Sequence, residues 1–172
     1  MKFAKGIAVV LALVGAFLVV WVKMPRSAFY GDSGPTRLGR ATTRFMVWWS
    51  GMGLPPGRQV VLELRGRKSG KLRSLPVVVA TVDGERYLVS MLGGGASWVA
   101  NARAGGPAWL RHGRREKVSL MEVFGPERVP VLREYVRLAP GARPFIPVAV
   151  DAPGSEFAAL VDRYPVFRVD PA

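Results

Sequence analysis

The chain has no cysteine and one histidine, His112, among its 172 residues. Without cysteine it has no disulfide, no thiolate nucleophile and no cysteine ligand for a metal. One histidine cannot build a histidine-based metal cluster, so no metal site is predicted. His112 lies in the run Arg-His-Gly-Arg-Arg, which is typical of a solvated turn, so a Ser-His-Asp triad is not expected.

Acidic residues are scarce as well: 12 Asp and Glu stand against 25 Lys and Arg, for a formal net charge of +13. The acids Asp83, Glu85 and Glu116 fall near predicted turns and do not suggest a catalytic carboxylate pair. The positive charge predicts an anionic partner: nucleic acid, anionic lipid or a polyanionic small molecule. Aromatic residues interleaved with cations on strands are not seen, so no nucleic-acid partner is predicted.

Common catalytic motifs are also missing. The sequence contains no G-x-x-x-x-G-K-[ST], no G-x-G-x-x-G after a predicted strand, no G-x-S-x-G and no H-E-x-x-H. If the protein is an enzyme, a bound cofactor is therefore expected to carry the chemistry.

The longest apolar run, Gly6 to Val22, has 17 residues without a charge. As a helix it would span about 25 Å, enough for a bilayer core with Trp21 at the interface. A secretory signal peptide is the alternative, but no small-x-small cleavage site follows the run. We therefore expect an uncleaved single-pass anchor over residues 1–24. Basic residues are more numerous after the run than before it, which predicts a cell-membrane protein with its C-terminal domain in the cytoplasm.

Residues 25–57 are predicted to form a linker followed by a basic amphipathic helix, Thr36 to Met52. The apolar residues of this helix share one face at helical spacing, and arginines flank that face. The face is formed by Leu38, Ala41, Phe45, Trp48, Trp49 and Met52. Two interpretations stay open: the face lies on a lipid surface, or it packs on the core or roofs a pocket. In the second, Trp48 and Trp49 form a lid.

Residues 58–172 are predicted to form the main domain. Six strand-like runs are recognised: Val60–Leu64, Leu75–Val82, Glu85–Met91, Ala108–Arg111, Lys117–Val123 and Val166–Val169. Asp83-Gly84 predicts a type I′ hairpin. Helices are predicted at Trp98–Arg103 with Ser97 as its cap, at Pro126–Leu138 with Pro126 in its first turn, and at Glu156–Arg163. Hairpin links without βαβ units predict an α+β fold built on an antiparallel barrel.

A basic ribbon lies between the first two predicted strands. Five cations occur in nine residues: Arg65, Arg67, Lys68, Lys71 and Arg73. Glycines there allow backbone N–H groups to turn toward a ligand, and arginine adds bidentate donors, so the ribbon is suited to gripping an anion. The alternative is a solvated hairpin tip on a basic protein.

Three segments, in this order and spacing, resemble the deazaflavin-dependent nitroreductase family: Gly66-Arg-Lys-Ser-Gly-Lys-Leu-Arg-Ser-Leu-Pro76, Tyr87-Leu-Val-Ser-Met-Leu-Gly-Gly94 and Ser97-Trp-Val-Ala-Asn101. The ending Tyr164 to Pro171 is similar to the family's last strand. The resemblance implies a split β-barrel, an FMN-binding-like antiparallel barrel with flanking helices. It also implies coenzyme F420, an 8-hydroxy-5-deazaflavin, as cofactor, with FMN less favoured. The family reduces quinones, nitro compounds and other conjugated acceptors, and some members bind lipids.

The resemblance also implies cofactor-binding residues. The phosphate and glutamate tail would meet Arg67, Lys68, Ser69 and Arg73. The ring would run along Ser90, Met91, Leu92 and Gly93. The loop and helix start beyond it would supply Ser97, Trp98, Val99, Ala100 and Asn101, although Trp98 is equally well explained as a core aromatic.

Two departures from the family stand out. Leu92 occupies the position where some members carry a serine, and no tyrosine lies between Tyr135 and Tyr164. A tyrosine proton donor is therefore not predicted, and no catalytic residue is assigned. The favoured function is a membrane-anchored oxidoreductase that passes a hydride from reduced F420 to a quinone-like or other conjugated lipophilic acceptor. A non-catalytic deazaflavin or lipid carrier is the alternative, and a homodimer is left open.

Overall fold

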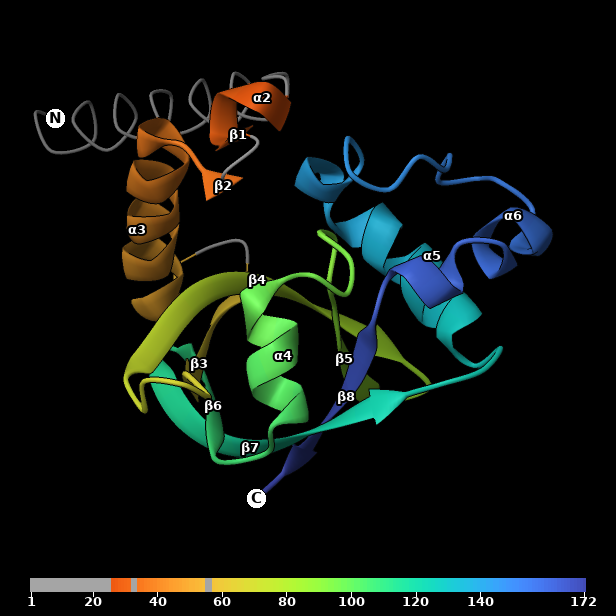
Figure 1. The fold of residues 1–172 in the computed structure, drawn as a ribbon. Helices are drawn as coiled ribbons and strands as arrows, with labels where there is room; N and C mark the ends of the chain where they lie inside the picture. Colours follow the sequence, from red (N-terminus) through yellow and green to blue (C-terminus); the bar gives the residue numbers. More distant parts are fainter. Residues whose placement is uncertain (1–25, 32–33, 55–56) are drawn as a thin grey trace, which may run out of the picture.

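The computed structural model describes residues 26–31, 34–54 and 57–172 (Figure 1). Six antiparallel strands close into a barrel in the order β3-β4-β5-β8-β7-β6. The strands are β3 (Gln59–Arg65), β4 (Leu72–Val82), β5 (Glu85–Val89), β6 (Ala108–His112), β7 (Arg114–Val123) and β8 (Val166–Pro171). The predicted six-stranded antiparallel barrel, flanked by helices, is confirmed.

Tight turns set the register of the barrel. Between β4 and β5, Asp83 has φ 51° and Gly84 has φ 83°. Two consecutive positive φ angles are what a type I′ turn requires, so the predicted hairpin is confirmed. The last strand, β8, pairs with β5 on one side and with β7 on the other, and this closes the barrel.

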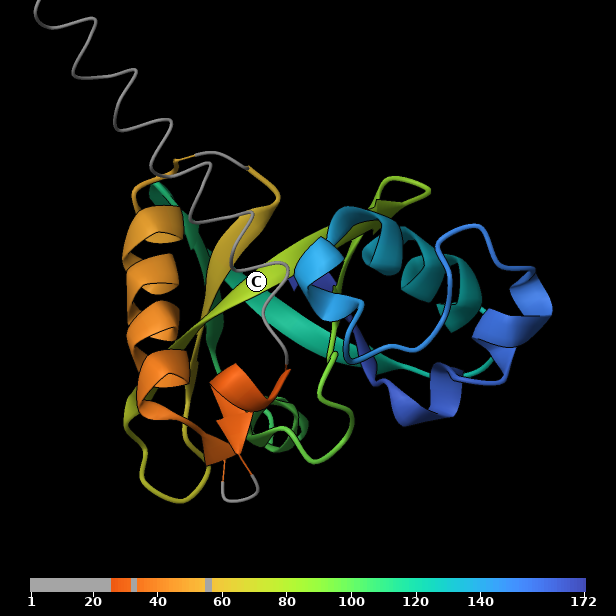
Figure 2. The same cartoon turned by 90° about the horizontal axis from the view of Figure 1, so that it is seen from above.

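The apolar residues form two cores. Side chains that alternate along the strands fill the barrel, among them Leu62, Leu88, Leu110, Val118 and Val169. A second core lies where α5 (Arg128–Leu138) packs on the outside of the barrel, and it holds Leu132, Val136, Ile146, Phe157 and Tyr164. Figure 2 shows this lobe on one side of the barrel and α3 (Arg37–Gly51) on the opposite side.

Short elements precede α3, in a region predicted to be only a linker. They are α2 (Arg26–Phe29), β1 (Tyr30–Gly31) and β2 (Gly34–Pro35). Thr36 caps α3: its hydroxyl accepts a hydrogen bond from Gly39 N (3.0 Å) and donates one to Ala28 O (2.7 Å). A Cβ on Gly39 would lie 2.3 Å from Phe29 O, so only glycine permits this close approach of α2 to α3.

The face of α3 that packs on the barrel is its small and polar face. Its buried residues are Gly39, Thr42, Met46, Ser50 and Gly51. The predicted apolar face points away, with Leu38 46%, Phe45 38%, Trp48 57% and Met52 46% exposed. The interpretation that these four residues pack on the core is therefore wrong. The helix packs on the rest of the chain mainly through small residues, with Met46 as the large side chain buried there.

Three element boundaries differ from the prediction. Helix α4 (Ser97–Arg103) has Ala96 at its N-cap, so Ser97 is its first residue and not its cap. Helix α5 starts at Arg128 behind the N-cap Glu127, which leaves Pro126 outside the helix. The helix predicted over 156–163 is two elements, α6 (Gly154–Ala158) and η2 (Val161–Arg163). They are separated because Leu160 N bonds to Phe157 O (3.0 Å), an i→i+3 contact that tightens the chain. A further short turn, η1 (Pro140–Ala142), follows α5.

The predicted membrane anchor, residues 1–24, lies outside the described residues. Across the ranges that are described, no helix has both the length and the hydropathy needed to cross a bilayer.

Candidate functional site

The basic ribbon forms a compact loop between β3 and β4. Gly66 N bonds to Lys71 O (2.9 Å) and Gly70 N bonds back to Gly66 O (2.8 Å). Gly70 adopts φ +64°, a conformation that costs glycine little. A Cβ on Gly66 would lie 2.9 Å from Ser69 Oγ, so the first glycine makes room for the serine hydroxyl. The sequence therefore fixes the shape of the loop through its two glycines.

The cations of this loop have no carboxylate counter-ion among the residues that the structure describes. Arg65, Arg67, Lys68, Lys71 and Arg73 are all exposed. Within the described part of the chain, none of them has a carboxylate partner within 4.0 Å. Like charges held together without counter-ions attract an anionic ligand strongly. A phosphate or carboxylate tail fits this chemistry, and it would meet guanidinium and ammonium donors there.

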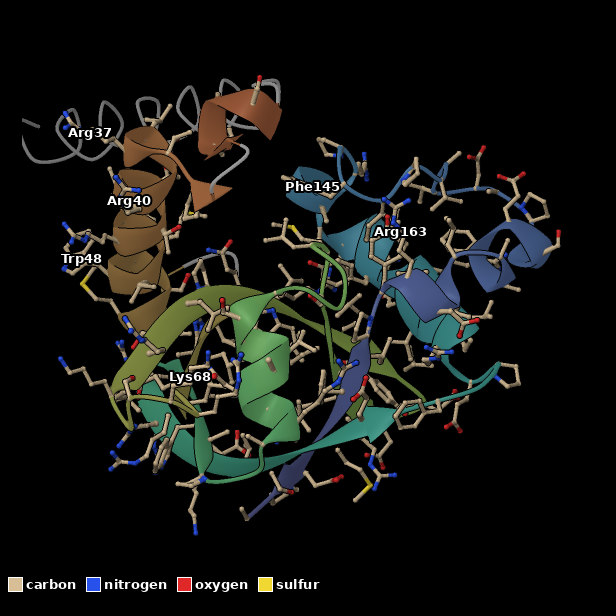
Figure 3. All side chains as sticks on the ribbon, in the orientation of Figure 1. Arg37, Arg40, Trp48, Lys68, Phe145 and Arg163 are labelled. Carbon is tan, nitrogen blue, oxygen red and sulfur yellow. The ribbon has the colours of Figure 1, made fainter. Side chains whose placement is uncertain are left out.

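Asn101 ties the loop to α4. Its Oδ1 accepts hydrogen bonds from Arg67 N (3.1 Å) and from Arg67 Nη1 (3.4 Å). Asn101 is only 9% exposed, and it joins residues 34 positions apart in the sequence. Figure 3 shows Lys68 on the loop beside α4. The structure thus brings the first and third predicted segments together, and it makes Asn101 a positioning residue for Arg67.

The second predicted segment forms a turn after β5. Ser90 is 1% exposed, and its hydroxyl donates to Gly93 O (2.8 Å) while its N–H donates to Pro165 O (2.9 Å). The Ser90 hydroxyl proton is therefore donated to a hydrogen bond inside the turn. Met91 packs partly against the second core, and Leu92 is 37% exposed. What this segment offers to a ring is its backbone and the Leu92 side chain.

Helix α4 turns its large side chains inward. The Trp98 ring lies 5.3 Å from the Phe167 ring and packs against the barrel core, while Val99 is fully buried. Trp98 is partly buried and packs on the barrel core, which agrees with the core interpretation, while its role toward the cofactor stays a prediction. At the end of α4, Arg103 pairs with Glu122 of β7 (2.6 Å), and this hydrogen bond raises the pKa of Arg103 above its ordinary value. The pair holds α4 against the barrel.

Replacing Gly93 by alanine should destabilise the fold by about 1–2 kcal/mol. Gly93 has φ +76°, and an added Cβ would lie 3.1 Å from Arg163 O, so the turn beside α4 would have to shift. Chemical denaturation measures the change. Gly95→Ala is the matched control, because Gly95 has ordinary backbone angles and nothing within 4 Å of the added Cβ. Equal losses in the two variants would contradict the assigned turn.

Neither tyrosine of the C-terminal region presents a free hydroxyl to a substrate. Tyr164 is 2% exposed and its hydroxyl donates to Phe145 O (2.6 Å). Tyr135 is 5% exposed and packs in the second core, as predicted. The buried positions of Tyr135 and Tyr164 agree with the prediction that neither residue donates a proton to a substrate.

The sequence did not point to a charged cluster on the outer face of β3. Glu63, 6% exposed, accepts hydrogen bonds from Arg111 Nε (2.9 Å) and Arg115 Nε (2.8 Å). The Arg115 guanidinium also stacks over Trp109, 4.2 Å from its ring centre. One sequence feature could have indicated this cluster: Glu63 lies inside the apolar strand Val-Val-Leu-Glu-Leu. A carboxylate buried in such a strand is expected to be paired with cations.

Comparison with known proteins adds a family. Residues 37–153 match the model of the F420H(2)-dependent quinone reductase family, a span that includes the basic loop, the Ser90–Gly93 turn and α4. No curated protein matches the chain.

Several solved structures are similar to it. One, described as an F420-H2 dependent reductase (FDR-A), is 27% identical, covers 66% of this chain and 94% of its own, with a TM-score of 0.43. A second, described as a domain-swapped dimer, is 25% identical over 77% of this chain and 96% of its own, with a TM-score of 0.43. A third, described as an F420 reductase, is 14% identical over 72% and 92%, with a TM-score of 0.41.

The family match covers well over half of the chain and contains all three segments on which the resemblance was based. The un-neutralised cations beside α4 suit the anionic tail of the family's coenzyme. The chain belongs to the F420H(2)-dependent quinone reductase family, and it is an oxidoreductase that uses coenzyme F420.

Proposed function

We propose that this protein is a membrane-anchored F420H2-dependent reductase whose acceptor is a quinone-like or other conjugated lipophilic molecule. The observation that carries the proposal is the group of un-neutralised cations on the β3–β4 loop, which Asn101 fixes beside α4. Coenzyme F420 carries a phosphate and a glutamate tail and, when reduced, supplies a hydride.

The residues of this chain would bind and orient. Arg67, Lys68 and Arg73 would hold the anionic tail through charge-assisted hydrogen bonds. The Ser90–Gly93 turn would lie along the ring with its backbone, since the Ser90 proton is already donated to Gly93 O. With the Tyr164 hydroxyl bonded to Phe145 O, water is the proposed source of the proton that accompanies the hydride.

Binding and turnover test this proposal. The full chain is titrated with oxidised F420 and, separately, with FMN, and binding is followed by fluorescence. Tight binding of F420 with weak binding of FMN is expected, followed by oxidation of reduced F420 when a quinone is added. Binding without turnover would favour the non-catalytic carrier. Preference for FMN would contradict the assignment of the cationic loop to the glutamate tail, which FMN lacks.

The membrane part of the proposal is supported by the uncharged run Gly6 to Val22. The full chain is expected to sediment with membranes and to resist carbonate extraction, with its barrel on the cytoplasmic side. A soluble product that begins near residue 25 would instead indicate a cleaved signal peptide. The oligomeric state stays a prediction, and a homodimer is one possibility to be measured.

The aromatic residues of α3 are proposed to help a lipophilic acceptor reach the site. Replacing both Trp48 and Trp49 by alanine should raise the apparent KM for a long-tailed quinone about tenfold or more, because contact with one such ring is worth about 1.5–3 kcal/mol. Coenzyme affinity and turnover with a short water-soluble quinone should change little.

Thermal unfolding serves as the control for this double variant. Trp48 is 57% exposed, so its loss should lower the melting temperature only slightly. Equal loss with both quinones, together with a large drop in melting temperature, would show that the tryptophans act through stability and not as a lid.

A further inference from the structure

The outer surface of α3 carries two parallel stripes. At 100° per residue, Leu38, Phe45, Trp48 and Met52 fall on one flank, and Arg37, Arg40 and Arg44 fall on the adjoining flank. The four apolar residues are each more than a third exposed. Phe45 lies 6.0 Å from Trp48 and 5.9 Å from Trp49 between ring centres, so the aromatic residues form one cluster. Such a continuous apolar patch rimmed by charge marks an interaction surface.

The charge of this helix has one sign. From Arg37 to Gly51 it contains no acidic residue. Among the described residues, no carboxylate lies within 4.0 Å of the three arginines, and Arg40 Nη1 donates only to Pro35 O (2.6 Å). Because no carboxylate of the described residues pairs with these arginines, their charges are available to anions outside the barrel.

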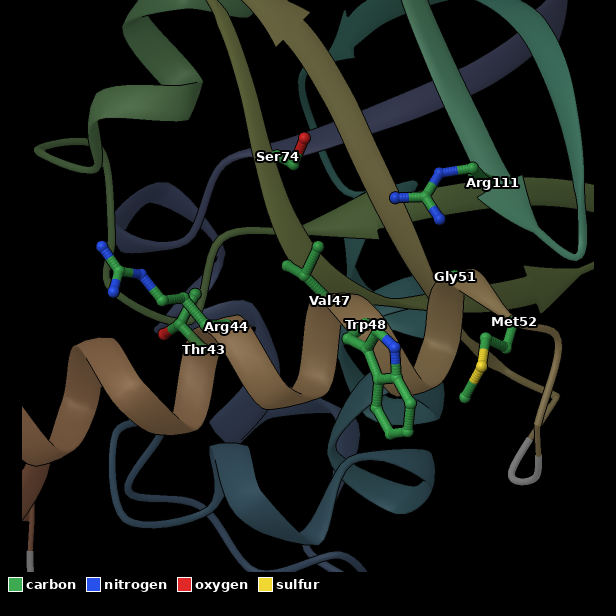
Figure 4. A pocket seen from close by; sticks show the side chains of 8 residues that line it. All are labelled: Thr43, Arg44, Val47, Trp48, Gly51, Met52, Ser74 and Arg111. Carbon is green, nitrogen blue, oxygen red and sulfur yellow. The ribbon is translucent and has the colours of Figure 1, made fainter.

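A groove of about 500 Å³ runs beside the arginine stripe (Figure 4). Thr43, Arg44, Val47, Trp48 and Met52 line it from α3, and Ser74 and Arg111 line it from the strands. Arg111 is held in place by Glu63, but the single Glu63 carboxylate is shared with Arg115 and leaves one of their two charges uncompensated. The groove therefore combines fixed positive charge with an apolar wall.

Arg73, a proposed coenzyme-binding residue, lies on the other face of β4 from the groove residue Ser74. In β4, Arg73 pairs with Leu64 of the barrel core, whereas Ser74 pairs with Glu63 of the outer face. Since successive side chains of a strand point to opposite faces, the side chain of Ser74 in the groove and that of Arg73 in the proposed coenzyme-binding set lie on opposite faces of β4.

We propose that the outer face of α3 docks the barrel on an anionic bilayer surface. Phe45, Trp48 and Met52 enter the boundary between headgroups and acyl chains, while the arginine stripe and the groove receive lipid phosphates. Aromatic and basic residues on one interfacial helix are suited to this arrangement. The docking extends the proposed membrane placement, but it depends neither on coenzyme binding nor on turnover.

A second copy of the chain is the rival occupant of this face. Each copy carries a formal net charge of +13, and the apolar stripe is bordered by arginines. Bringing two such faces together would place like charges opposite each other without counter-ions, which opposes association. An anionic bilayer supplies both the missing negative charge and the apolar phase.

The absence of cysteine makes a direct test possible, because one introduced cysteine carries a unique spin label. The full chain is labelled at Phe45→Cys and reconstituted into phosphatidylcholine vesicles with or without phosphatidylglycerol. Accessibility to oxygen and to a water-soluble nickel complex then reports the depth of the label. Met121→Cys is the control, since Met121 is 55% exposed on β7.

With phosphatidylglycerol present, the label at 45 should be reached by oxygen and shielded from nickel, and the label at 121 should be reached by nickel. Arg44→Gln should reduce the docked fraction relative to the undocked one about fivefold, as expected for one basic residue at an anionic surface. Arg114→Gln removes the same charge from the exposed start of β7 and should have a smaller effect.

Three results would overturn the proposal. A label at 45 that is as open to nickel as the label at 121 would show that α3 is not docked. Equal depth in vesicles with and without phosphatidylglycerol would show that docking does not need a net anionic surface, against the proposal. Dipolar broadening between labels on two chains would assign the face to self-association. Carbonate extraction reports the anchor separately, so failure of docking and failure of anchoring can be told apart.

Discussion

Replacing Lys68 by alanine should weaken the binding of coenzyme F420 by about 1.5–3 kcal/mol, which is roughly a ten- to 150-fold rise in Kd. Lys68 is exposed at the tip of the β3–β4 loop and has no carboxylate partner among the described residues. Its contribution to stability should therefore be small, and the loss should appear in binding. A fluorescence titration of the full chain with oxidised F420 measures the effect.

Two comparisons make this prediction specific. Lys71→Ala removes the same charge from the same loop at a position outside the proposed binding set, so it should weaken binding less. The loss in Lys68→Ala should also be larger for the glutamylated coenzyme than for a fragment without the tail. If both forms are weakened equally, Lys68 does not meet the tail, and the orientation of the coenzyme on the loop has to be reversed.

Replacing Phe157 by alanine should lower the free energy of unfolding by about 3–5 kcal/mol, the largest effect on stability that we expect from one substitution. Phe157 is fully buried in the second core, and the Arg133 guanidinium lies 5.2 Å from its ring centre. The ring packs between α6 and α5, so its removal leaves a cavity between two elements that are not consecutive in the chain. Urea denaturation followed by circular dichroism measures the change.

Phe124→Ala is the matched control for Phe157→Ala. Phe124 is 66% exposed, and its loss should change stability by less than about 0.5 kcal/mol. A small effect in both variants would mean that the lobe formed by α5 and α6 repacks freely and that Phe157 is not its anchor.

Much of the barrel could be predicted because short stretches of sequence specify its strands and turns. Asp83-Gly84 specifies a hairpin by backbone preference alone, and alternating apolar residues mark the strands on either side. The basic loop could be predicted for the same reason, since its glycines and cations lie within one short stretch. The contact between Asn101 and Arg67 could not be predicted, because the local sequence of neither residue indicates that it contacts a residue 34 positions away.

The orientation of α3 could not be predicted from its pattern. Hydrophobic spacing identifies the apolar face of a helix, but it does not say that this face packs on the rest of the chain. Here the contact is made mainly by small residues. A Cβ on Gly51 would lie 1.9 Å from Arg111 Nη1, so any larger residue there would require the guanidinium to move. Such a fit depends on two distant segments at once, and Arg111 is in turn fixed by Glu63.

The closure of the barrel by its last strand has a consequence for protein synthesis. Because β8, residues Val166–Pro171, lies between β5 and β7, two strand edges remain open until these residues leave the ribosome. The preceding strands can form hairpins earlier, but the complete barrel depends on contacts between distant parts of the chain and forms late. We therefore expect nascent chains that stop before residue 166 to need protection by chaperones, whereas the released full chain closes its own edges.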